Sequence, residues 1–154
     1  GTPFVFPSLG PTAFLLFHDP LQPAASPRSV LCGHAIGILC GYGSLWLLGL
    51  EHAPSAAATG VDAARIGCAA LSLASTGALM VLLGVWHPPA GATTLIIALG
   101  IITRPYHLLI IEAAVAMLVL QALIINRLAG IAYPVWAPAP PARTRDPASE
   151  RSAT

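Results

Sequence analysis

The segment of residues 87–94, which reads His-Pro-Pro-Ala-Gly-Ala-Thr-Thr, holds the residue types and spacing best suited to chemistry in this chain. Pro88 and Pro89 end a helix, and the Gly91-x-Thr93 pattern that follows opens another inside an otherwise apolar stretch. A helix that starts within a membrane leaves its first N–H groups unpaired and carries about half a positive charge at that end. We therefore expect a site for a small anion, bound by backbone N–H groups and threonine hydroxyls.

A second copy of this pattern lies near the N-terminus. Residues 7–16 align with residues 88–97, so that Gly10 falls on Gly91 and Thr12 on Thr93. Two such helix starts facing each other would bind an anion without a lysine. A plainer interpretation stays open, in which the two prolines only separate two helices at the membrane surface. The residues expected to bind substrate are Ser8, Gly10, Thr12, His34, His87, Pro88, Pro89, Gly91, Thr93 and Thr94.

Titratable residues accompany these segments. The ring of His87 can donate a hydrogen bond to an anion, carry a proton or ligate a metal. His34 lies inside one apolar stretch and Glu112 inside another, where charged side chains usually face the bundle interior or a water-filled path. Glu112 and His87 are therefore candidates for proton coupling. Alternatively, His87 caps an interfacial turn, and Glu112 pairs with Arg104 or with a histidine.

Other chemistry has little support in the sequence. The five histidines do not form a dense metal-ligand spacing, so we expect neither a metal nor a cofactor. No Gly-x-Ser-x-Gly, HExxH or P-loop motif is present. Ser8, His87 and Glu112 can be drawn as a hydrolytic triad, but nothing in their spacing requires it. We predict that the chain is not an enzyme.

Composition places these residues in a membrane. Hydrophobic residues make up 56% of the chain and charged residues 8%, whereas about a quarter of the residues of a soluble protein are charged. The chain is therefore predicted to be an integral membrane protein whose first partner is the lipid bilayer. Its net charge of +1 gives no reason to expect a nucleic-acid partner.

Three stretches are long enough to cross the bilayer as helices, since about 20 apolar residues span its hydrocarbon core. They are residues 30–50, 64–86 and 108–125. Two further apolar pieces, residues 12–17 and 91–102, are too short to cross squarely and predict half-helices or re-entrant segments. The predicted fold class is all-α, a polytopic transmembrane helix bundle with two short helices interrupted by Gly and Pro.

A stripe of glycines runs along the first long stretch. Small residues at a spacing of about four allow a second helix backbone to approach closely. We expect this face to pack against protein and not against lipid. The stripe consists of Gly33, Gly37, Gly41 and Gly43.

The chain divides into a membrane domain, residues 1–133, and a tail, residues 134–154, that is rich in Pro, Ala and Arg and lacks apolar periodicity. The tail is expected to be disordered. Residue 1 is Gly and no signal peptide follows it, which we interpret as a truncated start with helices missing upstream.

The alignment of the two short segments also predicts an inverted repeat. If both segments cross, two further crossings lie between them and the halves have opposite topology, as in transporters whose site lies between paired short segments. Residues 26–28 before the first long stretch resemble residues 103–105 before the third, and this second register places His34 opposite Glu112. The 18–28 loop, the 87–90 turn and the tail then share one side, and their arginines place that side in the cytoplasm. If the segments are re-entrant instead, the arginines are nearly balanced.

These pieces together resemble the HPP family of integral membrane proteins, which takes its name from the tripeptide found here at residues 87–89. Plastid members of that family are linked to nitrite transport, so the resemblance implies a small transmembrane bundle and nitrite as substrate. Some bacterial members carry a pair of CBS modules after the membrane region, whereas this chain has the short tail. The resemblance covers residues 8–128 and rests on residues 8–17, Gln22-Pro23, Pro27-Arg28, Gly33-His34 and residues 87–93.

The residues support a small-anion site, and the resemblance supplies nitrite. We therefore expect a membrane transporter or channel for a small monovalent anion, in a multi-pass protein of the bacterial inner membrane. A homo-oligomer is expected, because so small a bundle barely encloses a path. The alternative is a membrane sensor or scaffold protein without transport activity.

Overall fold

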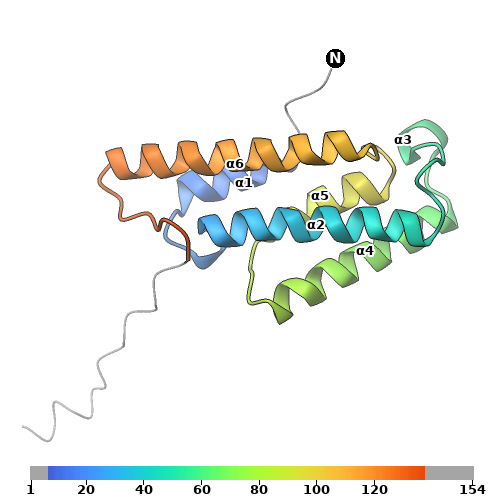
Figure 1. Ribbon diagram of the computed structural model, residues 1–154, viewed down its shortest axis with the longest axis horizontal. Coiled ribbons are helices and arrows are strands. Elements are labelled where there is room, and N and C mark those ends of the chain that lie inside the picture. Colours follow the sequence, from blue (N-terminus) through green and yellow to red (C-terminus); the bar gives the residue numbers. More distant parts are fainter. Residues whose placement is uncertain (1–6, 138–154) are drawn as a thin grey trace, which may run out of the picture.

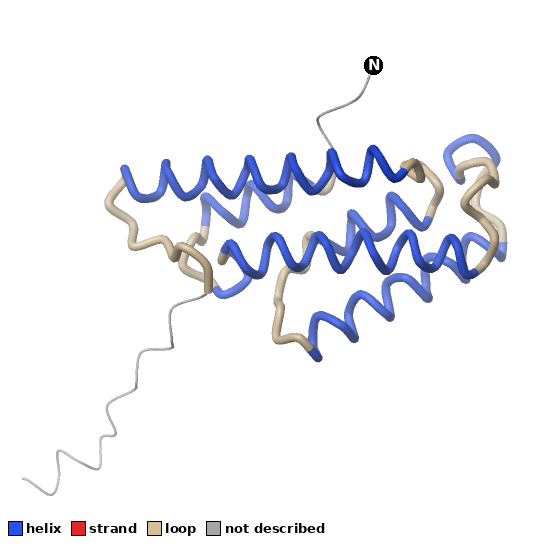
Figure 2. The backbone as a smooth tube through the Cα atoms, in the orientation of Figure 1, coloured by secondary structure: helices blue, strands red, loops and turns tan. Residues whose placement is uncertain are grey.

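The computed structural model describes residues 7–137, and this part of the chain forms helices and no strand. The predicted helical membrane bundle is therefore confirmed (Figures 1 and 2). Residues 1–6 and most of the predicted tail, 138–154, lie outside the described residues. The elements in chain order are α1 (Leu9–His18), the 3-10 turn η1 (Pro23–Ala25), α2 (Pro27–Leu47), α3 (Ala56–Thr59), α4 (Ala63–Leu82), α5 (Ala90–Ala98) and α6 (Pro105–Leu128).

The three predicted spans correspond to α2, α4 and α6, which have 21, 20 and 24 residues and are each apolar enough to cross a membrane. Helix α2 begins earlier than predicted, because Pro27 occupies its first position and the side chain of Ser26 accepts a hydrogen bond from the N–H of Ser29. Helix α4 ends earlier than predicted, at Leu82, and leaves residues 83–89 outside any helix. That irregular segment carries His87.

Helices α1 and α5 are half-helices. They contain 10 and 9 residues, so each is about 15 Å long and covers about half of the hydrocarbon core. Both begin near the middle of the bundle and run toward opposite ends of it (Figure 1). Helix α5 stops at Ala98, before the predicted end at residue 102, because Gly100 adopts a left-handed conformation with φ +74°.

The two halves of the chain have opposite directions. A long helix follows each half-helix and returns along the bundle, α2 after α1 and α6 after α5 (Figure 1). Thr12 and Thr93 each lie three residues after the first residue of their half-helix. His34 and Glu112 each lie seven residues after the first proline of their long helix. The helix boundaries therefore follow the register of the predicted inverted repeat.

Helix α2 lies at the centre of the bundle and contacts α4, α5, α6 and η1. Its glycine face meets α5 and the preceding turn. A Cβ at Gly33 would lie 2.7 Å from Cβ of His87, and one at Gly37 would lie 2.9 Å from the carbonyl oxygen of Ala90. The predicted packing against protein is therefore confirmed for Gly33, Gly37 and Gly41. It is wrong for Gly43, which is exposed and where a Cβ would have no atom within 4 Å, because this residue lies on another side of the helix.

Hydrogen bonds join the loops at each end of the bundle. At one end, the N–H of Arg28 donates to the carbonyl of Trp136 at 3.0 Å, and its guanidinium donates to the carbonyls of Leu83 and Gly84. The loop before α2, the segment after α4 and the segment after α6 therefore lie at one end of the bundle. The 87–90 turn, which was predicted to share that end, instead leads into the start of α5 near the middle of the bundle (Figure 1). At the other end, the buried guanidinium of Arg65 donates to the carbonyl of Ala98 at the last turn of α5.

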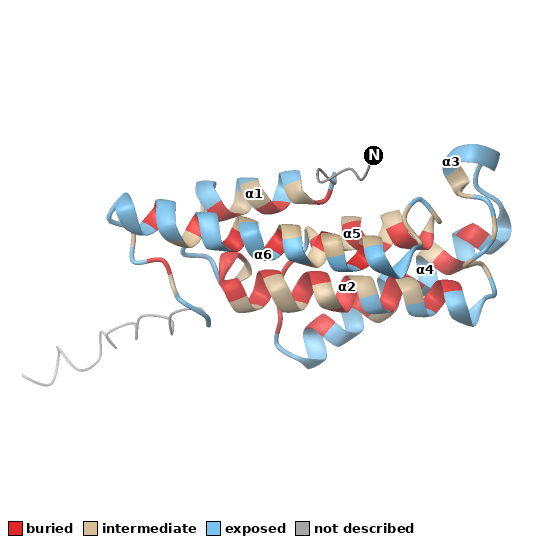
Figure 3. Ribbon diagram, turned by 45° about the horizontal axis from the view of Figure 1, so that its top comes forward, coloured by how far each residue is buried: buried red, intermediate tan, exposed pale blue. Residues whose placement is uncertain are grey.

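Burial is uneven around the bundle (Figure 3). Buried residues concentrate where α2 meets α5 and α6, whereas the outer faces of α4 and α6 expose large apolar side chains such as Leu82 and Leu128. Exposed apolar faces of this extent are unfavourable in water and favourable in lipid. The fold thus surrounds a packed interior with a lipid-facing surface.

Close packing of α2 on α5 makes a prediction for two glycines of the same helix. Gly37→Ala places a methyl group 2.8 Å from the hydroxyl oxygen of Thr94 and 2.9 Å from the carbonyl oxygen of Ala90. We expect it to destabilise the protein by about 1–3 kcal/mol relative to Gly43→Ala, which has open space and the same gain in helix propensity. Thermal unfolding in detergent measures the difference. Equal stability of the two variants would contradict the close approach.

Candidate functional site

Four polar side chains from four separate segments meet in the interior. Thr12, His34, His87 and Thr93 are each 0% exposed. The hydroxyl of Thr12 lies 3.0 Å from Nε2 of His34 and 3.1 Å from Nε2 of His87, and Nδ1 of His34 lies 2.8 Å from the hydroxyl of Thr93. The two imidazole rings have centroids 5.0 Å apart. We call these four residues the His–Thr cluster.

The local structure explains why these residues meet. Thr12 and Thr93 lie in the first turns of α1 and α5, whose N-terminal ends both lie near the middle of the bundle (Figure 1). Helix α2 begins at one end of the bundle, and its residue His34, two turns further on, lies at the same depth as these two helix starts. His87 follows the end of α4 and packs on Gly33, where the absence of a Cβ leaves room for its own. The cluster is therefore built by both half-helices, one spanning helix and the irregular segment.

The hydrogen-bond geometry determines which atom donates in each hydrogen bond of the cluster. Nδ1 of His87 lies 2.9 Å from the carbonyl oxygen of Ala24, which can only accept, so Nδ1 carries a hydrogen. In a neutral ring Nε2 is then an acceptor, and the hydroxyl of Thr12 donates to it. Nε2–H of His34 donates to Thr12, and the hydroxyl of Thr93 donates to Nδ1 of His34. In this arrangement every ring nitrogen of both histidines has a partner.

The carbonyl that orients His87 is itself held in place. Ala24 belongs to η1, and the hydroxyl of the fully buried Tyr133 donates to the neighbouring carbonyl of Ala25 at 2.6 Å. Burial raises the pKa of Tyr133 to about 12, so its hydroxyl stays a donor at neutral pH. The segment after α6 therefore fixes η1, and η1 fixes the tautomer of His87.

Thr94 lies on a different side of α5 from the cluster. Its hydroxyl is 3.2 Å from the carbonyl of Ala90 and 3.1 Å from the hydroxyl of Thr76 on α4. Gly37 approaches the same hydroxyl from α2. Thr94 thus joins three helices, and none of these contacts is with His34 or His87.

The predicted role of free backbone N–H groups at the start of α5 is wrong. The N–H groups of Ala90, Gly91 and Ala92 donate to the carbonyls of His87, Pro88 and Pro89, at 3.0–3.1 Å. The His-Pro-Pro turn therefore pairs the donors that a free helix start would offer. Pro88 and Pro89 shape this turn, and neither ring nitrogen can donate a hydrogen bond.

The two predicted ligand-approach glycines lie outside the His–Thr cluster. Gly10 is exposed and lines an apolar groove between α1 and α6. A Cβ at Gly91 would meet only Leu73, at 3.8 Å. Gly10 and Gly91 align in the sequence repeat because each lies at the start of a half-helix. The space beside each glycine is open or apolar.

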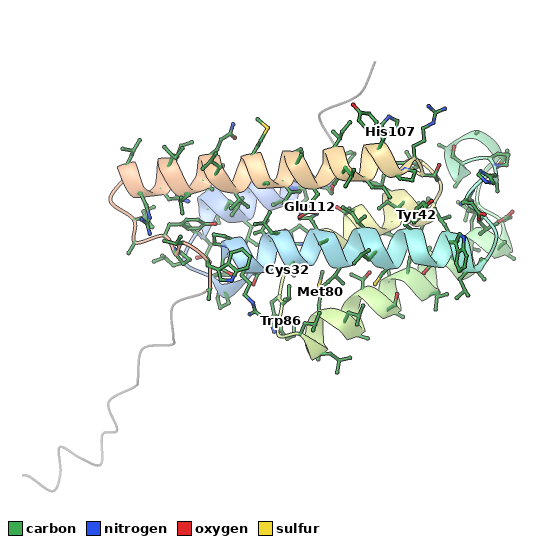
Figure 4. All side chains as sticks on the ribbon, in the orientation of Figure 1. Cys32, Tyr42, Met80, Trp86, His107 and Glu112 are labelled. Carbon is green, nitrogen blue, oxygen red and sulfur yellow. The ribbon has the colours of Figure 1, made fainter. Side chains whose placement is uncertain are left out.

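Two polar atoms near these elements are buried without a hydrogen-bond partner. They are the hydroxyl of Ser8, a residue that is 0% exposed, and Oε2 of Glu112. Ser8 precedes α1 directly, and its carbonyl lies 3.1 Å from the hydroxyl of Thr12. Glu112 is half-buried, on the side of α6 that faces the rest of the bundle (Figure 4). Unpaired buried polar groups are rare, so the hydroxyl of Ser8 is a candidate for contact with a ligand and Oε2 of Glu112 is a candidate for holding a proton.

Among residues 7–137, no three His, Cys, Asp or Glu side chains gather as a possible metal-ligand set. The His–Thr cluster offers two imidazoles and two hydroxyls. Such a set can donate hydrogen bonds to an anion and hold a proton.

Three contributors to the site have no clear signal in the sequence. They are the carbonyl of Ala24 and the hydroxyl of Tyr133, which act on His87, and the side chain of Asn126, which acts at a distance from the cluster by joining α6 to the carbonyl of Leu16 on α1 at 3.0 Å. A backbone carbonyl carries no sequence signature. Tyr133 is the last residue of the predicted membrane domain, and the chain stays bonded as far as Trp136, beyond that boundary.

Comparison with known proteins identifies the family. A family model described as HPP, transmembrane region, matches residues 1–134, and the chain belongs to that family. The predicted resemblance is therefore confirmed. No curated protein and no solved structure matches the chain.

The central position of Thr12 predicts a large effect of removing its hydroxyl. Thr12→Val leaves Nε2–H of His34 without an acceptor and Nε2 of His87 without a donor, and each buried unpaired group costs about 1–3 kcal/mol. Thr12→Ser keeps the hydroxyl and should lose much less. The free energy of unfolding of the two variants tests this, and a valine variant as stable as the serine variant would contradict the hydrogen-bonded cluster.

Proposed function

We propose that this member of the HPP transmembrane family transports a small monovalent anion through the bilayer, as a carrier or a channel, and that the anion binds at the His–Thr cluster. Nitrite is the first substrate to test, because the family resemblance implies it. The proposal is of transport and not of an enzymatic reaction.

The observation that carries the proposal is the burial of the cluster at the meeting point of two half-helices. Polar side chains inside a membrane protein are costly to keep and usually mark a substrate or ion path. Here four of them are fully buried at the depth where α1 and α5 begin. Half-helices that start near the membrane midplane are a common way in which transporters build a substrate site.

The local charge also favours an anion. The N-terminal ends of α1 and α5 each contribute about half a positive charge, and no described hydrogen bond or ion pair places a carboxylate against the two histidines. The start of α5 has its first N–H groups paired, so contact with an anion falls to side chains. The unpaired hydroxyl of Ser8 is one donor at this place.

The size of the cluster favours a small substrate. The ring centroids of His34 and His87 are 5.0 Å apart, and one threonine hydroxyl bridges them. A planar anion of three atoms such as nitrite is close in size to a group that can bridge the two rings. A phosphate is larger and would need more space between the rings and more hydrogen-bond donors.

Orientation and assembly are part of the proposal. The end of the bundle that holds Arg28 and Arg127 faces the cytoplasm in this proposal, because arginines close to the ends of membrane helices favour that side. We place the protein in the bacterial inner membrane. A homo-oligomer would complete the enclosure of a path, because α1 and α5 each cover only half of the bilayer thickness.

Uptake of nitrite into proteoliposomes tests the proposal. The wild-type chain should give saturable uptake above that of protein-free vesicles, and Thr93→Val should reduce it about tenfold or more, since one hydrogen bond to a charged group is worth about 1.5–3 kcal/mol. Thr93→Ser, which keeps the hydroxyl next to His34, should recover most of the uptake.

Insertion and thermal unfolding of all three proteins must be matched before uptake is compared. Nitrate, formate and chloride as competitors define the selectivity. A well-folded wild-type protein that moves none of these anions would overturn the transport proposal and favour the sensor or scaffold.

A further inference from the structure

The hydroxyl of Thr12 has more hydrogen-bond partners than one proton can serve when both histidines are neutral. It lies 3.1 Å from the carbonyl oxygen of Ser8, 3.0 Å from Nε2 of His34 and 3.1 Å from Nε2 of His87. A hydroxyl has one hydrogen to donate and two lone pairs to accept with. The carbonyl can only accept. The three contacts therefore depend on how many hydrogens the two imidazoles carry.

With both rings neutral, one of the three contacts stays unmade. Nδ1–H of His87 donates to Ala24, so its Nε2 needs the hydrogen of Thr12. The hydroxyl then has no hydrogen left for the carbonyl of Ser8. The hydroxyl of Thr93 is also in use, because it donates to His34. In this state both histidines are uncharged, and the carbonyl of Ser8 receives no hydrogen from Thr12.

One added proton satisfies all three contacts without moving a heavy atom. If Nε2 of His87 is protonated, Thr12 accepts from both histidines and its hydroxyl donates to the carbonyl of Ser8. The only bond formed is N–H, and the proton comes from the aqueous phase. The other ring nitrogen of His87 keeps its bond to Ala24. The geometry of the cluster therefore has a place for one proton, at His87.

The cost of that proton is its charge, because a buried cation without a counter-charge is unfavourable. The charged and titratable groups around His87 do not remove this cost. Neutral His34 faces it from α2, and the guanidinium of Arg28 binds the carbonyls of Leu83 and Gly84 just before it, so neither group supplies a negative charge. Glu112, on the inward side of α6, is the acidic group that could take up the proton in place of His87, and the experiment must distinguish these two residues (Figure 4).

An anion in the site would supply the missing counter-charge. We propose that His87 takes up one proton when the anion binds and releases it when the anion leaves, so that proton and anion move together. When His87 is protonated, the hydroxyl hydrogen of Thr12 turns from Nε2 of His87 to the carbonyl oxygen of Ser8. This inference rests on the proposed function, because it names the co-transported ion of the same site. It also chooses His87 over Glu112, the two coupling candidates of the sequence.

Proton uptake on binding can be measured without transport. The purified full-length chain in detergent, in weakly buffered solution with a pH indicator, is titrated with sodium nitrite at constant starting pH, and binding is followed in parallel by calorimetry. We expect about one proton per bound nitrite. Nitrogen NMR of the ¹⁵N-histidine-labelled protein should show His87 as the Nδ1–H tautomer before nitrite and as imidazolium after it.

Glu112→Gln is the matched control, and it should keep both the nitrite affinity and the proton uptake. Binding of nitrite without proton uptake would overturn the coupling and leave the anion site intact. Proton uptake that disappears in Glu112→Gln while nitrite still binds would also overturn it, since the proton would belong to Glu112. Absence of nitrite binding in a folded protein would overturn the anion site itself, and the coupling with it.

Discussion

The contact of the glycine face of α2 with α5 and the turn before it determines much of this structure. At Gly33 and Gly37 a methyl group would overlap the neighbouring backbone or side chains, so these contacts require the smallest residue, and at Gly41 a methyl group would be tightly packed. Without Gly33, His87 could not lie against α2, and its ring could not share a hydroxyl with His34. In a bilayer, where apolar surface gains little from leaving lipid, this close fit and the polar bonds that it permits hold the interior together.

The polar interior is assembled from segments that are distant in the chain. Thr12 and His87 are 75 positions apart, and His34 and Thr93 are 59 apart. The repeat of short and long helices explains why distant segments meet, because each half of the chain supplies one half-helix with a threonine at the equivalent position. The long helices differ at the equivalent position, His34 in α2 and Glu112 in α6. This difference makes one half basic and the other acidic at a matching place.

Patterns in the sequence were sufficient to predict the spans, the half-helices and a set of ten site residues that includes the four members of the His–Thr cluster. Hydropathy, proline positions and glycine spacing each follow from local rules. The pairing of the first N–H groups of α5 could not be predicted, because it depends on the path of the carbonyls of residues 87–89. Gly10 and Gly91 were assigned from their alignment, which identifies helix starts but not which side of the helix a ligand could reach. Tyr133 stabilises η1 through a contact across 108 residues, for which no periodicity exists.

The opposite directions of α1 and α5 have an electrical consequence. Their positive N-terminal ends face each other near the middle of the bundle, so the two dipoles largely cancel at a distance and their positive potentials add where the two helices begin (Figure 1). The resulting potential has its maximum at the depth of the His–Thr cluster and falls toward both membrane faces. An anion would meet the same attraction from either side. The two dipoles by themselves therefore favour neither membrane face.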